Sequence, residues 1–143
     1  MNNFIAMLYE FLFNYDTYQT LLGMVFDNLD YGKMGWMLIL VPVISLIMFY
    51  KFWDPVKGAK LKWYLSLVFI IILCYAITTG ILYNNSEILQ YIGNATGAVG
   101  EVDADYFILQ MSIISLVYAL IISIVFSITF FRFLSTNNRY NPF

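Results

Sequence analysis

The sequence predicts an all-α integral membrane protein with three transmembrane helices that follow an N-terminal amphipathic helical segment. Of the 143 residues, 62% are hydrophobic and only 11% are charged, whereas a soluble domain carries roughly 25% charged residues. Three runs without Asp, Glu, Lys or Arg approach the roughly 20 residues that a helix needs to cross a bilayer. These runs lack the alternation of barrel strands, and only helices and closed barrels satisfy the backbone in lipid.

The composition also narrows the function classes. The chain has seven basic and nine acidic residues, one cysteine and no histidine. One cysteine cannot form a disulfide within the chain, and zinc or haem sites usually need histidine or several cysteines. A nucleic-acid binder would show a basic surface, whereas the net charge here is −2. We therefore expect no metal, no cofactor and no nucleic-acid partner.

The apolar runs set the expected boundaries along the chain. The first run is short on its own, and it reaches spanning length if Lys51 snorkels to the interface and the helix continues through Trp53. The expected segments are an extracytoplasmic N-terminal segment (1–33), transmembrane helices (34–53, 61–83 and 106–131), a short cytoplasmic turn (54–60), an extracytoplasmic loop (84–105) and a cytoplasmic tail (132–143). Within the loop we expect a short helix from Ser86 to Ile92.

The distribution of charge predicts the orientation, because basic residues are retained on the cytoplasmic side. The connection between the first two spans carries four lysines against Asp54, and the tail carries Arg132 and Arg139. The loop between the second and third spans is acidic and has no basic residue. The N-terminal segment has four acidic residues and only Lys33 as a base. These charges predict an N-out, C-in topology.

The N-terminal segment shows the period of an amphipathic helix. Apolar residues at alternating spacings of four and three share one stripe, here called the N-terminal stripe: Phe4, Leu8, Phe11, Tyr15, Tyr18, Leu22, Val25 and Leu29. We expect either one kinked helix or two consecutive amphipathic helices before the first span, with the kink or break at Asn14 to Asp16, where Asp16 is positioned to cap a second helix. Lipid-surface helices are usually rich in lysine and arginine, whereas this segment is acidic. We therefore expect the stripe to contact protein, in the same chain or in another.

Small residues repeat along the third span. The series, here called the serine ladder, comprises Ser112, Ser115, Ala119, Ser123 and Ser127. Small side chains let another helix approach closely. The ladder therefore predicts either packing against the other spans of this chain or an interface with another subunit. Ala76 and Gly80 on the second span, also four apart, are the expected partners for internal packing.

The outer loop contains two features with a structural and a functional interpretation. Asp103 and Asp105 precede the third span, where an acidic residue can cap the helix N-terminus. Together with Glu101 they also offer oxygens to a divalent cation, but a calcium site needs six to eight oxygens. The cap is the preferred interpretation. Asn84 and Asn94 each begin a match to the glycosylation sequon, which short polar stretches also produce by chance.

The distribution of ionisable residues argues against catalysis. Acid–base chemistry uses ionisable side chains in a pocket, and coupled transporters keep one among their helices, whereas the predicted spans contain no Asp or Glu. We expect a non-catalytic integral membrane subunit that anchors or scaffolds a larger membrane protein assembly. Its expected partners are the lipid bilayer and other membrane subunits or copies of itself. The expected location is the cell inner (cytoplasmic) membrane as a multi-pass protein, with an organellar inner membrane as the alternative.

A self-associating pore former is the alternative function. Three spans, an N-terminus outside and a short basic tail inside resemble the topology of three-span phage holins. The resemblance covers the layout of the whole chain and includes no shared motif. It implies oligomers that open the membrane, in which the serine ladders of several copies would line a wet lumen.

Overall fold

The computed structural model describes residues 1–13, 15–53, 58–94, 102–130 and 133. Helices make up most of this part of the chain, and it contains no strand. In chain order they are α1 (Asn2–Glu10), α2 (Tyr15–Asp27), α3 (Asp30–Ile47), the π-helix η1 (Met48–Trp53), α4 (Ala59–Tyr83), α5 (Ser86–Asn94) and α6 (Ala104–Thr129). The predicted all-α class is confirmed for the described residues.

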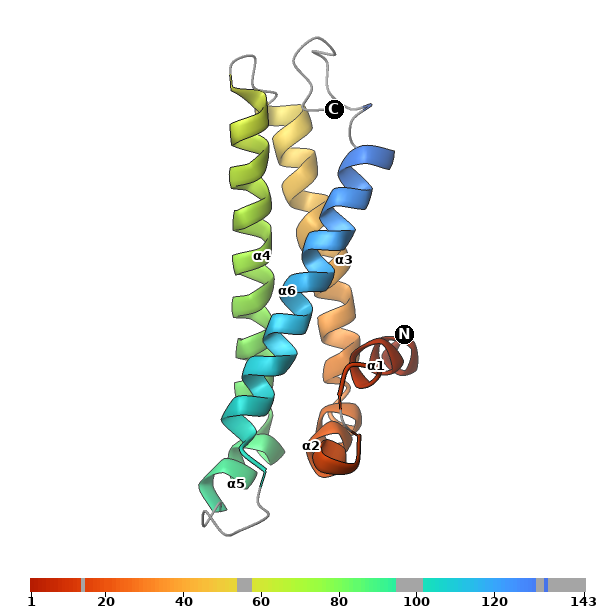
Figure 1. Cartoon of the computed structure of the whole chain (residues 1–143), viewed down its shortest axis with the longest axis vertical. Helices are drawn as coiled ribbons and strands as arrows, with labels where there is room; N and C mark the ends of the chain where they lie inside the picture. Colours follow the sequence, from red (N-terminus) through yellow and green to blue (C-terminus); the bar gives the residue numbers. More distant parts are fainter. Residues whose placement is uncertain (14, 54–57, 95–101, 131–132, 134–143) are drawn as a thin grey trace.

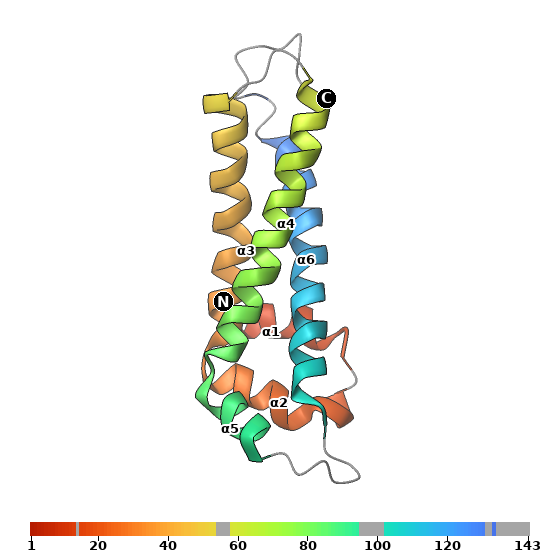
Figure 2. The same ribbon diagram turned by 90° about the vertical axis from the view of Figure 1, so that its left-hand side faces the viewer.

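Three long helices form a bundle in which α3, α4 and α6 run side by side (Figure 1, Figure 2). Three segments are long and apolar enough to cross a membrane: Asp30–Phe52, Ala59–Tyr83 and Ala104–Thr129. The three predicted spans are therefore present as helices. The shorter helices α1, α2 and α5 gather near the end of the bundle at which α3 and α6 begin.

The first span begins earlier than its apolar run predicts. Helix α3 starts at Asp30 rather than at Met34, so Asp30 and Lys33 belong to the helix. The two charged residues form an ion pair. The predicted span was defined by the absence of charged residues, so it could not include this first turn of the helix. Leu29, with a left-handed backbone (φ 58°), makes the corner between α2 and α3. At the other end η1 carries the helix to Trp53, as predicted.

Two consecutive helices precede the first span, which is one of the two predicted alternatives. Helix α1 ends at Glu10 and α2 begins at Tyr15. Asp16 is the second residue of α2 and not its N-cap, which corrects the predicted capping position. The first turn of a helix also suits an acidic residue, because the helix dipole is positive there. Figure 2 shows α1 lying across the bundle, with α2 closer to the end of the molecule.

The outer loop contains the predicted short helix and the predicted cap. Helix α5 extends from Ser86 to Asn94, beyond the expected end at Ile92. Asp103 caps α6, because its carboxylate accepts hydrogen bonds from the backbone N–H groups of Asp105 (2.9 Å) and Tyr106 (3.1 Å). Helix α6 consequently begins at Ala104, two residues before the predicted start at 106.

Parts of five predicted segments lie outside the described residues. They are residue 14 of the N-terminal segment, residues 54–57 of the cytoplasmic turn, which include Asp54 and Lys57, residues 95–101 of the outer loop, which include Glu101, residue 131 of the third span, and the tail apart from Phe133. The cation-binding interpretation of the outer loop, which needs Glu101, therefore stays a prediction.

The long helices are apolar on both their inner and outer faces. Buried positions include Leu46, Ile70 and Ala119, whereas Ile72 and Val117 are among the exposed apolar residues. A helix that is apolar all round is buried in a large protein or in a membrane. The outer faces of this small bundle therefore suit contact with hydrocarbon.

Ala119 provides a test of the packing of α6. It is fully buried, so Ala119→Leu adds bulk to a filled interior, which typically costs about 1–3 kcal/mol. We expect the variant to unfold at a lower temperature in mild detergent. Val117 on the outer face is 45% exposed, and Val117→Leu is the matched control because it adds bulk toward the surroundings. Equal unfolding temperatures for the two variants would contradict the assigned inner face.

Candidate functional site

The serine ladder lies inside the bundle of its own chain. Ser112, Ser115, Ala119, Ser123 and Ser127 are each fully buried on α6. The neighbours of α6 in the bundle are α3 and α4 (Figure 1). The structure therefore brings the whole ladder together as an internal surface, and a second subunit could reach it only if the bundle opened.

Hydroxyl groups at both ends of the ladder bind α4. Ser112 Oγ is hydrogen-bonded to Thr79 Oγ1 at 2.8 Å. Near the opposite end of α6, Trp63 Nε1 donates to Ser127 Oγ at 2.8 Å. Ser127 Oγ is also hydrogen-bonded to the hydroxyl of Tyr50, which belongs to η1, at 2.6 Å. The ladder is therefore a line of polar contacts as well as a close-packed face.

Tyr9 connects α1 to Ser115, the second residue of the ladder. Its hydroxyl is 2.6 Å from Ser115 Oγ. Ser115 donates its single proton to the carbonyl of Met111 (3.1 Å), so Tyr9 is the donor of the shared bond. Burial raises the pKa of Tyr9 well above that of a free phenol, which keeps this proton in place. Tyr118 of α6 adds a second link, because its hydroxyl donates to the carbonyl of Leu8 at 2.7 Å.

Helix α1 also packs closely against α3. The Tyr9 ring contacts Tyr31 of α3, with ring centroids 6.0 Å apart. Gly35 lies directly beneath Ile5, and a Cβ atom at position 35 would come within 2.6 Å of Ile5 Cγ1. Glycine therefore permits α1 to approach the backbone of α3. Contacts on both α3 and α6 set the orientation of α1.

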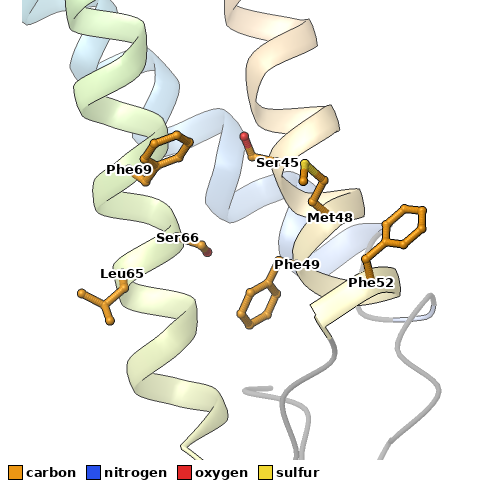
Figure 3. Close-up of a pocket in the computed structure, with 7 residues that line it drawn as sticks. All are labelled: Ser45, Met48, Phe49, Phe52, Leu65, Ser66 and Phe69. Carbon is orange, nitrogen blue, oxygen red and sulfur yellow. The ribbon is translucent and has the colours of Figure 1, made fainter.

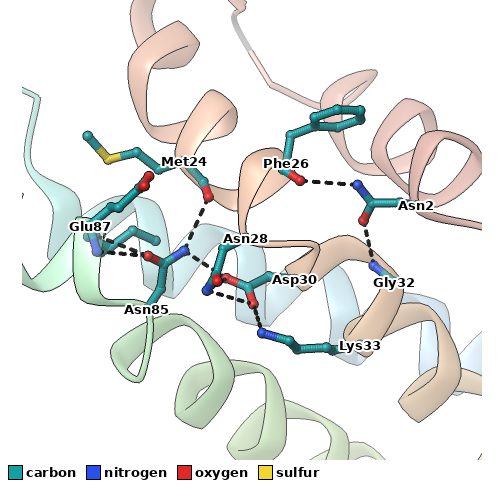
Figure 4. A network of polar contacts seen from close by, with 10 residues as sticks. Asn2, Met24, Phe26, Asn28, Asp30, Gly32, Lys33, Asn85 and Glu87 are labelled. Carbon is teal, nitrogen blue, oxygen red and sulfur yellow. Dashed lines mark hydrogen bonds and ion pairs between the residues drawn. The ribbon is translucent and has the colours of Figure 1, made fainter.

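A buried carboxylate joins the N-terminal helices to the bundle (Figure 4). Asp30 is fully buried and forms an ion pair with Lys33 at 2.6 Å. Asn28 Nδ2 donates to both carboxylate oxygens, at 3.2 and 3.1 Å, and Asn85 Nδ2 donates at 2.8 Å. A buried charge is tolerated when it is paired and hydrogen-bonded. These partners make Asp30 a structural joint.

Asn85 extends this joint to the outer loop. Its Nδ2 also donates to the carbonyl of Met24 in α2 at 3.3 Å. Its Oδ1 accepts from the backbone N–H of Glu87 at 3.0 Å, which is the contact of an N-cap at the start of α5. One fully buried side chain therefore binds α2, α3 and α5 together.

The structure does not bring the N-terminal stripe onto one face. Phe4, Leu8, Phe11 and Leu29 are exposed, Tyr18 is half-buried, Leu22 and Val25 are buried, and Tyr15 is the first residue of α2. On α1 the buried residues are Ile5, Ala6 and Tyr9. The stripe assumes one continuous helical wheel, and the break after Glu10 turns the two helices independently. Half of the predicted contact residues therefore remain available on the surface.

Ala76 and Gly80 also lie apart from the ladder. Both are on the exposed side of α4, whereas Cys74 and Thr78 are buried. A Cβ atom added at Gly80 would have no neighbour within 4 Å. The expectation that Ala76 and Gly80 pack against the ladder is therefore wrong for this structure. Residues spaced four apart lie on one face of a helix, but the spacing does not determine whether that face is turned toward the bundle or away from it.

Two residues that join the elements of this site, Tyr9 and Asp30, are not singled out by the sequence patterns. Ile5, Ala6 and Tyr9 follow the helical period as well as the N-terminal stripe does, so the period alone leaves the buried face of α1 open. For Asp30 the available signal is Lys33 one turn later, since charges at this spacing form ion pairs on a helix.

Two serines of the ladder allow a matched test of its polar contacts. Ser127 binds Tyr50 and Trp63, whereas Ser123 Oγ has no hydrogen-bond partner in the described part of the chain. We expect Ser127→Ala to lower the free energy of unfolding by about 1–3 kcal/mol, because it removes the shared hydrogen-bond partner of two buried side chains. Ser123→Ala should be nearly neutral. Equal losses, measured by thermal unfolding in detergent, would show that the hydrogen bonds do not hold the bundle.

Comparisons with known proteins do not identify a relative. No protein-family model, no curated protein and no solved structure matches the chain. The residues that remain open to other molecules are therefore the basis for inferring a function. The ladder and the Asp30 joint are occupied by contacts within the chain, and the outer face of α1 is exposed.

Proposed function

We propose that this chain is a non-catalytic multi-pass membrane subunit that anchors or scaffolds a larger membrane protein assembly. The observation that supports the proposal is the exposed apolar surface of α1 and of the turn that follows it, here called the α1 face: Phe4, Met7, Leu8, Phe11 and Leu12. Phe11 is 86% exposed and Met7 71% exposed. Exposed apolar patches of this kind mark contacts with protein or membrane.

The charge of the N-terminal region favours protein over lipid as the occupant of the α1 face. Helices that lie on membranes usually carry lysine and arginine to meet anionic headgroups. The first basic residue of this chain is Lys33, and Glu10 and Asp27 precede it. A protein partner can cover the exposed aromatic side chains without bringing these acidic residues close to anionic headgroups.

The rigid attachment of α1 also supports a docking role. Tyr9 holds the helix to α6 and Ile5 packs against Gly35 of α3. A surface that is already ordered loses less conformational entropy when it binds. The α1 face is therefore preorganised for a partner.

No exposed surface of the described residues supports the pore-forming alternative in the way that the α1 face supports the scaffold. Its lumen would need the serine ladder to face outward, and all five ladder residues are buried in the chain's own bundle. The exposed faces of α4 and α6 carry apolar residues such as Ile72 and Val117, which do not suit a water-filled pore.

We further infer an N-out, C-in orientation in the cell inner membrane. The support is the separation of charges between the two ends of the bundle. Lys51, Lys60 and Lys62 lie in η1 and the first turn of α4. Among the described residues, the acidic ones lie on α1, α2 and α5, in the first turn of α3, and at the N-cap and in the first turn of α6. Basic residues are retained in the cytoplasm.

Thiol labelling tests this orientation. Asn94 and Lys60 are both exposed, near opposite ends of α4, and the native Cys74 is fully buried. We expect an impermeant thiol reagent to label Asn94→Cys in intact cells and to label Lys60→Cys only after lysis. Labelling of Lys60→Cys alone in intact cells would invert the topology.

Aspartate substitutions test the α1 face. Phe4→Asp with Phe11→Asp should release a partner or lower the particle mass in mild detergent, because a charge opposes burial of this face. The measurement is particle mass together with identification of copurified proteins. Leu89→Asp is the matched control, since Leu89 is 48% exposed on α5. Unchanged mass and partners in the double variant would leave the α1 face in contact with lipid and sink the scaffold proposal.

A further inference from the structure

A groove with a volume of about 640 Å³ lies between α1 and α2. Residues of both helices line it: Asn3, Met7 and Glu10 from α1, and Leu22, Gly23 and Phe26 from α2. A Cβ atom added at Gly23 would have no neighbour within 4 Å, so the groove is open above this residue. Met7 and Phe11 belong both to the groove lining and to the α1 face, so the two surfaces are continuous.

Hydrogen bonds of Asn2 hold the two walls of the groove in place (Figure 4). Asn2 Nδ2 donates to the carbonyl of Phe26 in α2 at 3.2 Å. Asn2 Oδ1 accepts from the backbone N–H of Gly32 in α3 at 2.8 Å. The groove is therefore formed by helices that are already joined to each other and to the bundle.

The groove lies beside the spans rather than beyond their ends. Tyr9 of α1 binds Ser115, and the ring of Tyr18 in α2 contacts the ring of Phe107, so both helices pack along the first part of α6. Ser115 lies eleven residues after the start of the candidate span Ala104–Thr129, which is about 16 Å at 1.5 Å per residue. A bilayer around the three spans would therefore place α1 next to hydrocarbon.

Glu10 is the charged residue among those that line the groove. It is half-buried at the end of α1 and forms no ion pair within the described part of the chain. The hydroxyl of Tyr31 interacts with Glu10, but a phenol is neutral and leaves the carboxylate charge uncompensated. Ionisable residues at membrane depth are costly and usually pair with an opposite charge. Glu10 therefore favours an occupant that brings a cation.

The groove between η1 and α4 differs in this respect (Figure 3). Its volume is similar, about 620 Å³, but the described residues that line it are apolar apart from Ser45 and Ser66. That lining offers no charge that would select one occupant over another.

A second copy of this chain in the same orientation is poorly suited to supply the cation. Among the residues described near this end of the bundle, Lys33 is the only basic one, and it is paired with Asp30 at 2.6 Å. Asp30 is fully buried, so releasing Lys33 would leave a buried carboxylate without a counter-charge, which is strongly destabilising. The cation is therefore expected from a different protein.

We propose that the groove receives one face of a transmembrane helix of a different membrane protein, and that a lysine or arginine of this helix pairs with Glu10. This inference rests on the proposed scaffold function and specifies the class of partner. Leu22 and Phe26 supply apolar contacts for such a helix. The open space above Gly23 lets its backbone approach closely.

Photo-cross-linking of the full chain in intact cells tests the proposal. Phe26→p-benzoylphenylalanine places the reactive group in the groove lining, where Phe26 is 39% exposed. We expect it to cross-link to an apolar helix of another membrane protein, with a lysine or arginine within two turns of the cross-linked residue. Mass spectrometry of the cross-linked peptide identifies this segment. Leu89→p-benzoylphenylalanine, at an exposed position of α5, should not give this product.

Two matched pairs of variants separate the charge of the groove from its shape. Glu10→Gln removes the charge and keeps a side-chain oxygen for Tyr31, and it should lower the cross-link yield about tenfold. Glu87→Gln removes the same charge from an exposed position of α5 and should leave the yield unchanged. Gly23→Leu fills the groove and should also lower the yield, whereas Gly93→Leu, at a glycine that likewise has no neighbour within 4 Å, should not. Thermal unfolding verifies that each variant is folded.

Exchanging the two charges completes the test. Glu10→Lys should abolish the cross-link, and replacing the basic residue of the partner helix by glutamate should restore it. An unchanged yield with Glu10→Gln, or a product that contains only a second copy of this chain or only lipid, overturns the proposal. If Glu10→Gln keeps the cross-link while Phe4→Asp with Phe11→Asp releases the same partner, the ion pair is wrong and the scaffold function stands.

Discussion

The need to satisfy polar side chains away from water governs the arrangement of this bundle. Hydrocarbon offers a hydroxyl no partner, so each serine of a spanning helix gains from a partner within the protein. Ser112, Ser115 and Ser127 find theirs on α4, α1 and η1. The single helix α6 thereby determines which elements surround it. A small-residue face and a polar face coincide, so close packing and hydrogen bonding act at the same positions.

Sequence patterns predicted the elements of this fold because their causes are local. Three long apolar runs, the stop between Glu10 and Tyr15 and the Asp103 cap all depend on neighbouring residues in the chain. The observed helices differ from the predicted ones mainly at Asp30, whose partner Asn85 is 55 residues away. Residues near Asp30 in the sequence do not include Asn85, so the charge of Asp30 favoured a position outside the first span.

The faces of the helices were harder to predict than the helices themselves. Helix α1 carries apolar residues all round, and contacts with residues distant in sequence, such as Ser115 and Gly35, select Tyr9 and Ile5 for burial. On α4, Thr79 bonds with Ser112 while Ala76 and Gly80 point away. Periodicity shows which residues share a face of a helix, and contacts with the neighbouring helices determine which face is buried.

The Tyr9–Ser115 contact has a consequence for the order in which the chain is assembled. The two residues are 106 positions apart, and Tyr118, which binds the carbonyl of Leu8, is 110 positions from it. Helix α1 can therefore reach its final place only after α6 has been made. A nascent or truncated chain that lacks α6 holds α1 without these anchors. A partner that requires the ordered α1 face would consequently bind chains that already contain α6 and would not bind shorter nascent chains.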